Sequence, residues 1–412
     1  MIIKSVHLNN FRNYGRLDLE VGPSVNIFYG FNAQGKTNVI EAVNVCSCLS
    51  SHRTSKDKDM VKFGENDYSV NLKLKDEVYG SDTELQVDYY GENSDFTKSA
   101  TPKRVLSQDG MTISKTSLYL GICNTVMFAP EDLNLIKGSP SVRRKFLNIL
   151  ISRVSPTYFN LLNKYNRLIE QKNLSLKLLR GKDDKGDSLD FWDFSLAEIS
   201  SEIILNRYFY VKLLSEHASM HHGDISENNE SLTLSYNTVT GAIELLERLL
   251  LKNDIRPDIS LLNAPTAVIG TIKDELSSFL LSKLKNCRHQ DIEKGVSSIG
   301  VHKDDLDISL NDLSMKIYSS QGQQRSAALS LKLSELDIIR DNRSSSPILL
   351  LDDVFSELDE KRRRSLISGI INAQIFITCT DKSYITSELQ EVIGNSADIR
   401  FFRVDKGVIT PE

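Results

Sequence analysis

Eight residues near the start of the chain have the types and spacing of a loop that holds the phosphates of a nucleotide. They are Gly30, Phe31, Asn32, Ala33, Gln34, Gly35, Lys36 and Thr37, and they match the pattern G-x-x-x-x-G-K-[ST]. Glycine lets backbone N–H groups turn toward phosphate oxygens. Lys36 supplies a positive charge for the β- and γ-phosphates, and the Thr37 hydroxyl can bind Mg²⁺. We therefore predict that all eight bind nucleotide and that Lys36 is also catalytic.

The neighbouring residues suit this interpretation. Residues 25–29 form a mostly apolar, strand-like run, and residues 37–43 continue as a plausible helix. Strand, loop and helix in this order are the context that a phosphate loop requires. The alternative is a chance glycine turn before a helix, and two further motifs argue against it.

The second motif is a pair of acidic residues, Asp352 and Asp353, which follow four consecutive aliphatic residues. Such a run predicts a strand buried on both faces of a parallel sheet, and ligands bind at the carboxyl ends of these strands. Asp352 is predicted to hold Mg²⁺ together with Thr37, directly or through water. Asp353 is predicted to orient or deprotonate the attacking water. The alternative is an aspartate pair that caps a helix after a core strand.

The third motif spans residues 320–325, where Ser320 and Gly322 precede an apolar helical stripe that begins at Ala328. A helix N-terminus of this kind can bind an anion. By itself the motif is weak, because serine and glycine are common before helices. Its place upstream of the aspartate strand strengthens it, as does the Ser-x-Leu-Asp stretch at 356–359.

The separation of the motifs predicts how the chain is organised. Lys36 and Asp352 lie near opposite ends of the sequence, yet both would have to contact one magnesium nucleotide. The two ends must therefore fold together, with the middle inserted between them. We expect an α/β head made of residues 1–130 and 295–412, with an antiparallel strand subdomain that includes strands near 69–74 and 84–90. Residues 131–294 are expected to form a mainly helical insert.

Together these motifs resemble the ATP-binding-cassette (ABC) ATPases of the chromosome-maintenance, or SMC-like, branch. Further stretches are similar to the RecF family of bacterial recombination mediators. They are residues 3–14, 51–55, 128–133, 143–147, 300–305 and 320–325. Two departures stand out: Val301 and Lys303 replace the usual proline and arginine. The second acidic position is Asp353, as is usual in this family, where transporter ATPases carry glutamate.

The resemblance implies an ABC-type, SMC-like P-loop ATPase head, with ATP and Mg²⁺ as cofactors and slow, DNA-stimulated hydrolysis. It implies an ATP-dependent homodimer in which Ser320 and Gly322 of one subunit close on the γ-phosphate held by residues 30–37 of the other. It also implies binding to single-strand/double-strand DNA junctions, partnership with RecR and indirectly with RecO, and recombinase loading in repair and replication restart.

Other function classes stay open at this point. The chain could instead be the soluble motor subunit of a non-DNA ABC system, or bind ATP only as a structural element. The long helical middle and the Gln-Gln-Arg run at 323–325 favour the DNA-repair class. A threonine near the apolar run at 375–379, Thr378 or Thr380, is a further candidate for phosphate contact.

Composition indicates a globular, cytoplasmic protein. The chain has 412 residues, of which 40% are hydrophobic and 25% charged, and no apolar run is long enough to span a membrane. The first residues lead into a strand-like run with no signal-peptide pattern. The five cysteines are scattered and odd in number, which fits reduced thiols. His217 and His221 are spaced to share a helical face, but no third metal ligand is suggested nearby.

The net charge of −5 means that DNA contact would need local basic patches. Three groups of residues are candidates. They are Arg143, Arg144 and Lys145; Lys361, Arg362, Arg363 and Arg364; and His52, Arg53, Lys56 and Lys58. The simpler alternative for each is a solvated helix face, and the second group could serve a dimer contact instead.

Overall fold

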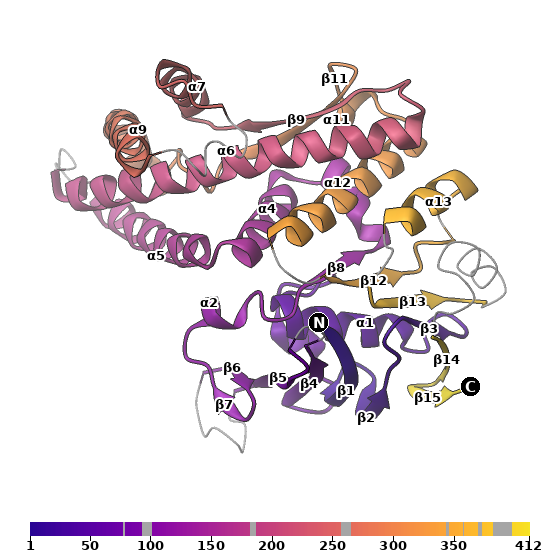
Figure 1. Ribbon diagram of the computed structural model, residues 1–412. Coiled ribbons are helices and arrows are strands. Elements are labelled where there is room, and N and C mark those ends of the chain that lie inside the picture. The colour runs from indigo at the N-terminus through magenta and orange to yellow at the C-terminus, as the bar shows by residue number, and fades with distance from the viewer. Residues whose placement is uncertain are drawn as a thin grey trace. The chain divides into compact units, whose positions relative to one another are not determined.

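The computed structural model describes residues 1–76, 79–92, 101–181, 187–256, 265–342, 346–356, 358–369, 373–381 and 398–412 (Figure 1). The chain divides into two compact units. The first unit contains Met1–Leu133, Asp224–Glu227 and Arg325–Glu412, and the second contains Asn134–Gly223 and Asn228–Gln324. Both ends of the chain thus belong to one unit, as the motif spacing predicted. The division falls at residue 324, whereas the sequence suggested 294, and the domain boundaries themselves stay a prediction.

An antiparallel sheet of six strands forms one layer of the first unit. In spatial order the strands are β2 (Tyr14–Glu20), β1 (Ile2–Phe11), β4 (Asp67–Lys75), β5 (Asp82–Tyr90), β6 (Lys103–Gln108) and β7 (Met111–Thr112). Alternate residues of β4 are buried, because successive side chains of a strand point to opposite faces. β4 and β5 confirm the two strands expected from alternating apolar residues.

A second sheet of six strands contains the strand that ends at Asp352 and the strand that leads into the phosphate loop. Its order is β15 (Val408–Pro411), β14 (Ile399–Asp405), β3 (Val25–Tyr29), β13 (Ile375–Cys379), β12 (Ile348–Asp352) and β8 (Thr125–Phe128). Every pairing is parallel except that between β14 and β15. All five residues of β12 are buried, as the run of aliphatic residues predicted.

Helix α1 (Lys36–Cys48) joins the two sheets into one core. Its side chains Val39, Ile40 and Val43 are fully buried in a cluster that contains Val6 of the first sheet and Leu350 of the second. Phe28 stacks with Phe376 and Phe402 in the same cluster, and their ring centroids lie 6.3 and 5.0 Å, respectively, from that of Phe28. Burial of this apolar area drives the two chain ends together.

Short elements complete the first unit. They are η1 (Asp57–Met60), α2 (Thr116–Tyr119), η2 (Pro130–Leu133), α13 (Glu360–Gly369) and most of α12 (Gln321–Asn342), whose first turn belongs to the second unit.

The second unit is mainly helical, as expected. Its helices are α3 (Asn134–Lys137), α4 (Pro140–Val154), α5 (Pro156–Leu179), η3 (Asp187–Leu189), α6 (Asp190–Ser226), α7 (Ala242–Lys252), α9 (Thr266–Asn286), α10 (Arg288–Lys294) and α11 (Met315–Tyr318). It also contains an antiparallel sheet in the order β11 (Leu313–Ser314), β10 (Asp305–Leu310) and β9 (Leu232–Asn237).

Inside this unit a buried ion cluster joins three helices. The Lys172 ammonium on α5 lies 2.8 Å from the Asp193 carboxylate on α6 and 3.9 Å from Asp291 on α10. The cation and the two carboxylates hold these helices together, because removing the lysine or an aspartate would leave a buried charge uncompensated.

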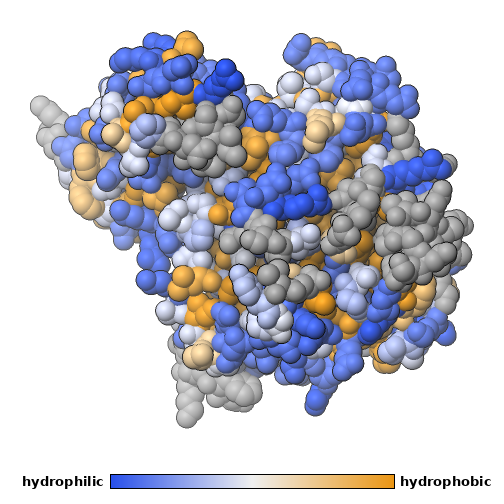
Figure 2. Space-filling view, in the orientation of Figure 1, coloured by the Kyte–Doolittle hydropathy of each residue, from blue (hydrophilic) through white to orange (hydrophobic). Residues whose placement is uncertain are grey.

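The predicted fold class is confirmed: an α/β head with an antiparallel sheet, and a mainly helical insert. On the face drawn in Figure 2, hydrophilic residues predominate and the hydrophobic patches are scattered. Among the described residues, no helix is both long enough and apolar enough to cross a membrane. Glu357 and residues 182–186 lie outside the described residues.

Candidate nucleotide site

Strand register brings the sequence motifs to one edge of the second sheet. Asp352 at the end of β12 is paired with Thr378 on β13, and Thr378 is paired with Phe28 on β3. Because the strands are parallel, their carboxyl ends meet, and the phosphate loop begins at the residue after Tyr29. The first unit therefore assembles Gly30–Thr37, Asp352 and Asp353 within itself.

The backbone of the phosphate loop requires glycine at two positions. Gly30 has φ 144°, and a Cβ atom there would lie 2.4 Å from the carbonyl oxygen of Val404. Gly35 has φ 113° and caps helix α1, and its carbonyl accepts a hydrogen bond of 3.1 Å from the Tyr14 hydroxyl. Any other residue would be strained or would clash, so the loop depends on backbone that only glycine adopts readily.

Lys36 folds over the loop that it follows. Its Nζ donates hydrogen bonds to the carbonyl oxygens of Gly30 (2.7 Å) and Phe31 (2.8 Å). Burial lowers the pKa of Lys36, and the nearby charges of Asp353 and Asp352 oppose that shift. The ammonium group therefore lies at the centre of the loop with two carboxylates in range, which suits a group that neutralises phosphate charge.

Asp352 is held by two threonines. Its Oδ1 accepts hydrogen bonds from the hydroxyls of Thr37 (2.8 Å) and Thr378 (2.6 Å). Burial raises the pKa of Asp352, and the two hydroxyl bonds oppose that shift. A hydroxyl and a carboxylate this close together are hard oxygen donors, which are the ligands that Mg²⁺ prefers. Thr37 and Asp352 thus fit the predicted metal site.

Thr378 has a role that the sequence did not reveal. Its hydroxyl also accepts a hydrogen bond of 2.9 Å from the backbone N–H of Asp353. It therefore fixes both aspartates at once. The sequence marked Thr378 only as a candidate for phosphate contact, because register between strands far apart in sequence cannot be read from composition.

Asp353 lies at a turn rather than in the strand. Its φ is 50°, in the left-handed region, and the Ser356 hydroxyl donates to its carbonyl oxygen (2.8 Å) and its Oδ1 (3.2 Å). The carboxylate is partly exposed. A carboxylate that is partly open to water beside the metal ligand can orient a water molecule.

His52 corrects one expectation about DNA contact. Its side chain is only 12% exposed, and its Nε2 lies 4.0 Å from Oδ2 of Asp352. Burial lowers the pKa of His52, which opposes a charged imidazole. Arg53 is also engaged, with Nη1 3.0 Å from the Asn38 amide oxygen and 3.6 Å from Glu41. His52 therefore belongs beside the nucleotide site, whereas Arg53, Lys56 and Lys58 are exposed.

The structure also corrects the expectation that Arg143 and Arg144 are available for DNA contact. Arg143 is buried, and its guanidinium makes two hydrogen bonds, of 2.8 and 2.7 Å, to the Asp305 carboxylate. Arg144 donates to the carbonyl oxygen of Asp304 at 2.7 Å. Both arginines therefore hold α4 against β10 within the second unit. The sequence showed three adjacent cations but not the Asp305 carboxylate 162 positions away or the Asp304 carbonyl 160 positions away.

The group of cations at residues 361–364 is partly engaged as well. Arg362 donates from Nε to the Ser326 hydroxyl at 2.9 Å and pairs with Asp359. Arg363 donates to the Leu358 carbonyl at 3.2 Å. The side chain of Lys361 lies outside the described residues.

Ser320 and Gln323 form a capping box at the start of α12. The backbone N–H of Ser320 donates to the Gln323 side-chain oxygen at 2.8 Å, and the backbone N–H of Gln323 donates to the Ser320 hydroxyl at 3.3 Å. Gly322 lies in the first turn. The signature thus opens a helix, as expected, and this end of α12 belongs to the second unit.

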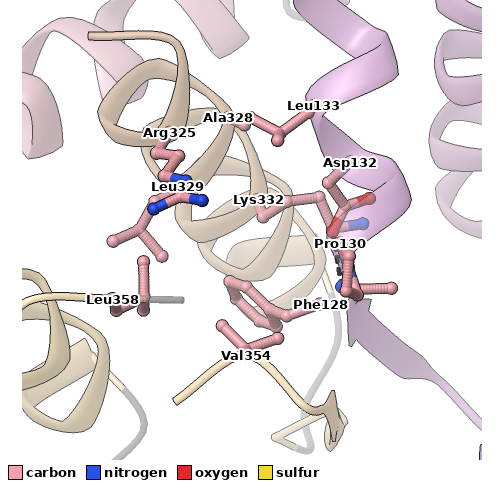
Figure 3. A pocket seen from close by; sticks show the side chains of 11 residues that line it. Phe128, Pro130, Asp132, Leu133, Arg325, Ala328, Leu329, Lys332, Val354 and Leu358 are labelled. Carbon is pink, nitrogen blue, oxygen red and sulfur yellow. Dashed lines mark hydrogen bonds between the residues drawn. The ribbon is translucent and has the colours of Figure 1, made fainter. Parts of the chain in front are cut away.

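A small pocket in the first unit lies beside the residues that follow β8 and β12 (Figure 3). It encloses about 50 Å³, and its walls are mostly apolar. Lys332 is buried in its wall, and the half-buried Asp132 accepts a hydrogen bond of 2.8 Å from the Ala129 N–H. Burial raises the pKa of Asp132 to about 6.

Comparison with known proteins decides the family. Residues 2–398 match the family model described as the RecF/RecN/SMC N terminal domain. The DNA replication and repair protein RecF of Acetivibrio thermocellus is 36% identical over 407 residues, which cover 99% of each chain. The chain belongs to the RecF family. The RecF of Clostridium tetani is likewise 36% identical over 99% of both chains.

Solved structures of RecF proteins have the same fold. One, described as the recombination mediator protein RecF-ATP in the RecFOR pathway, is 30% identical and matches with a TM-score of 0.83 over 100% of this chain and 97% of its own. A second, described as RecF-ATPrS, is 31% identical with a TM-score of 0.81 over 99% and 97%. Agreement over the full length favours the DNA-repair class over a transporter motor subunit.

Proposed function

We propose that this RecF-family chain binds ATP with Mg²⁺, hydrolyses it slowly under stimulation by DNA, and acts in the cytoplasm as a recombination mediator. In this proposal it recognises single-strand/double-strand junctions at gaps. There it promotes recombinase loading together with RecR, and indirectly with RecO. Membership of the RecF family supports the class of function, and the solved RecF-ATP relative supports the nucleotide.

One observation carries the nucleotide part of the proposal. Residues from both ends of the chain, Thr37 and Asp352, share a hydrogen bond at the edge of the parallel sheet, and Lys36 lies beside them. A structural aspartate pair would need no phosphate loop, and a chance glycine turn would need no aspartate. Their combination in one unit is what a phosphate-binding ATPase requires.

Each residue has a distinct task in this site. The backbone N–H groups of Gly30–Thr37 and the Lys36 ammonium bind the phosphates. Thr37 and Asp352 would hold Mg²⁺, which supplies charge neutralisation at the phosphates. Asp353 accepts a hydrogen bond from the attacking water and so orients it. Thr378 keeps both aspartates in place through its hydroxyl.

The signature supports an ATP-dependent homodimer. Ser320 and Gly322 open α12, whose first N–H groups can bind an anion. In the proposed dimer that anion is the γ-phosphate held by the partner's loop. The capping box engages the Ser320 hydroxyl and the backbone N–H groups of Ser320 and Gln323, so the γ-phosphate would replace the cap as their partner.

DNA contact needs cations that are not already paired. On α5, Lys164 and Arg167 are exposed and line a groove together with three amide residues, Asn160, Asn163 and Gln171. None of the described residues that line this groove carries a carboxylate. Neither cation forms an ion pair with another described residue. Ammonium, guanidinium and amide groups on one helix face suit a sugar-phosphate backbone, so we assign DNA contact to this face rather than to Arg143.

Single-turnover ATP hydrolysis, with and without gapped duplex DNA, tests the proposed function. The proposal predicts slow hydrolysis that gapped DNA accelerates, and no hydrolysis by a Lys36→Met control. A hydrolysis rate that is the same with and without gapped DNA would favour a non-DNA ATPase. ATP binding without any hydrolysis would favour a purely structural nucleotide.

A further inference from the structure

His52 is a mostly buried side chain whose ring nitrogens lack hydrogen-bond partners. Both of its ring nitrogens are inaccessible to solvent, and neither has a hydrogen-bond partner among the described residues. A buried donor or acceptor that stays unpaired costs about 1–3 kcal/mol. Groups of this kind persist where they have a function or where a ligand completes them.

The turn that carries His52 is fixed by helix α1. Glu41 accepts a hydrogen bond of 2.6 Å from the Ser51 hydroxyl, and the Asn44 amide donates to the Ser50 carbonyl at 2.9 Å. Asn38 accepts from Arg53 on the other side of His52. Since α1 begins at Lys36, these contacts hold His52 at a set position relative to the phosphate loop.

His52 faces the one oxygen of Asp352 that the threonines leave open. Thr37 and Thr378 both bond to Oδ1, whereas Oδ2 faces the Nε2 of His52 at 4.0 Å. This separation is too long for a direct hydrogen bond, which needs about 2.7–3.2 Å. Two groups this far apart can share one small polar ligand about 2.8 Å from each, such as a water molecule that enters with the ion, since solvent does not reach the ring nitrogens in this structure.

We propose that His52 is a positioning residue of the magnesium site: Nε2 of His52 and Oδ2 of Asp352 hold between them a water molecule that belongs to the shell of the ion. His52 thereby strengthens the contribution of Mg²⁺ to nucleotide binding, without touching the nucleotide. The inference rests on the proposed ATP function. It replaces the DNA-contact role that the sequence suggested for this residue.

The test compares nucleotide affinity with and without the ion. The dissociation constant of a fluorescent, non-hydrolysable ATP analogue is measured in excess Mg²⁺ and in EDTA, and their ratio gives the strengthening due to Mg²⁺. Loss of one hydrogen bond to a polarised ligand should reduce this ratio about tenfold in His52→Phe. His52→Gln, whose amide can reach a similar position, should restore most of it. Lys56→Gln, an exposed cation four residues away, is the control and should match the unaltered protein.

The outcomes separate this inference from the proposed function. A His52→Phe protein with an unchanged ratio would overturn the inference, and so would equal losses in Mg²⁺ and in EDTA. Failure of the unaltered chain to bind the analogue at all would instead refute the proposed nucleotide function. Far-ultraviolet circular dichroism of each variant checks the fold, and His52→Gln keeps the test decisive if the phenylalanine variant is unstable.

Discussion

The hydroxyl of Thr37 donates a hydrogen bond of 2.8 Å to Oδ1 of Asp352, across 315 positions of the sequence. This contact joins the residue that follows the phosphate-loop lysine to the end of a buried strand near the other end of the chain. Neither residue could serve a magnesium nucleotide alone. The nucleotide site therefore requires both chain ends in one unit, and the second unit is inserted between them in the sequence.

Replacing Lys36 by methionine should abolish nucleotide binding and leave the fold intact. Methionine keeps most of the length of the side chain but removes the charge and its two hydrogen bonds to carbonyl oxygens. Loss of two charge-assisted bonds to phosphate corresponds to about 3 kcal/mol or more, or at least about 100-fold in affinity. Calorimetric titration with ATP measures this effect. Normal affinity in a folded variant would contradict the assignment of the loop.

Replacing Asp353 by asparagine should preserve ATP binding and slow hydrolysis by about 100-fold or more, because the group that orients water becomes neutral. Asparagine tolerates the left-handed backbone that Asp353 adopts, so the change tests charge rather than strain. Single-turnover hydrolysis and equilibrium ATP binding are measured on the same preparation. Hydrolysis at the unaltered rate would exclude Asp353 as the base and point to Glu131, whose charge acts on Asp352.

Two sets of charge changes should separate DNA contact from fold stability. Lys164→Gln with Arg167→Gln should weaken DNA binding and reduce the slope of log affinity against log salt by about two, with little change in melting temperature. Arg143→Gln should instead lower the free energy of unfolding by about 3 kcal/mol, because it leaves Asp305 without its buried partner. Fluorescence anisotropy at several salt concentrations, with thermal melts, distinguishes them. Unchanged DNA affinity in the double variant would place the contact elsewhere.

Asp132 should make the stability of the first unit depend on pH. Burial raises its pKa to about 6, above the value of 3.8 for an ordinary aspartate, so the folded state binds its proton more tightly than the unfolded state does. The stabilisation from this group is complete below pH 4 and is lost as the pH rises to about 6, by roughly 3 kcal/mol. Asp132→Asn cannot lose a proton. The melting temperature of the variant relative to the unaltered chain should therefore rise between pH 4 and pH 7, and a constant difference would contradict the shift.

Much of the nucleotide site was predictable because its chemistry is local in sequence. Gly30–Thr37 need consecutive residue types for a tight loop before a helix, and Asp352 needs a run of aliphatic residues before it. Patterns of period two or of continuous apolar residues also predicted β4, β5, β12 and β13. Each of these features can be recognised from a short stretch of consecutive residues, without knowledge of distant contacts.

The rest depended on contacts between distant residues. Arg143 looked like a DNA-binding cation because Asp305, its partner, lies 162 positions away. His52 looked exposed because its neighbours are polar, whereas α1 and Asp352 enclose it. The pairing of β10 with β9 was missed for the same reason, since short strands carry little pattern and their pairing is set by tertiary packing.

The central claim is that ATP joins two copies of the chain through the signature of one and the phosphate loop of the other. Sedimentation velocity at matched protein concentration, with a non-hydrolysable ATP analogue, with ADP and without nucleotide, tests it most directly. We predict dimers with the analogue alone, because only the analogue carries a γ-phosphate for Ser320 and Gly322 to bind. Ser320→Arg should bind the analogue as a monomer, and Ser320→Ala, which also loses the helix cap at a cost of about 1 kcal/mol, controls for that loss and should still dimerise. Equal monomer fractions in all three conditions, or a Ser320→Arg protein that dimerises with the analogue, would contradict the account.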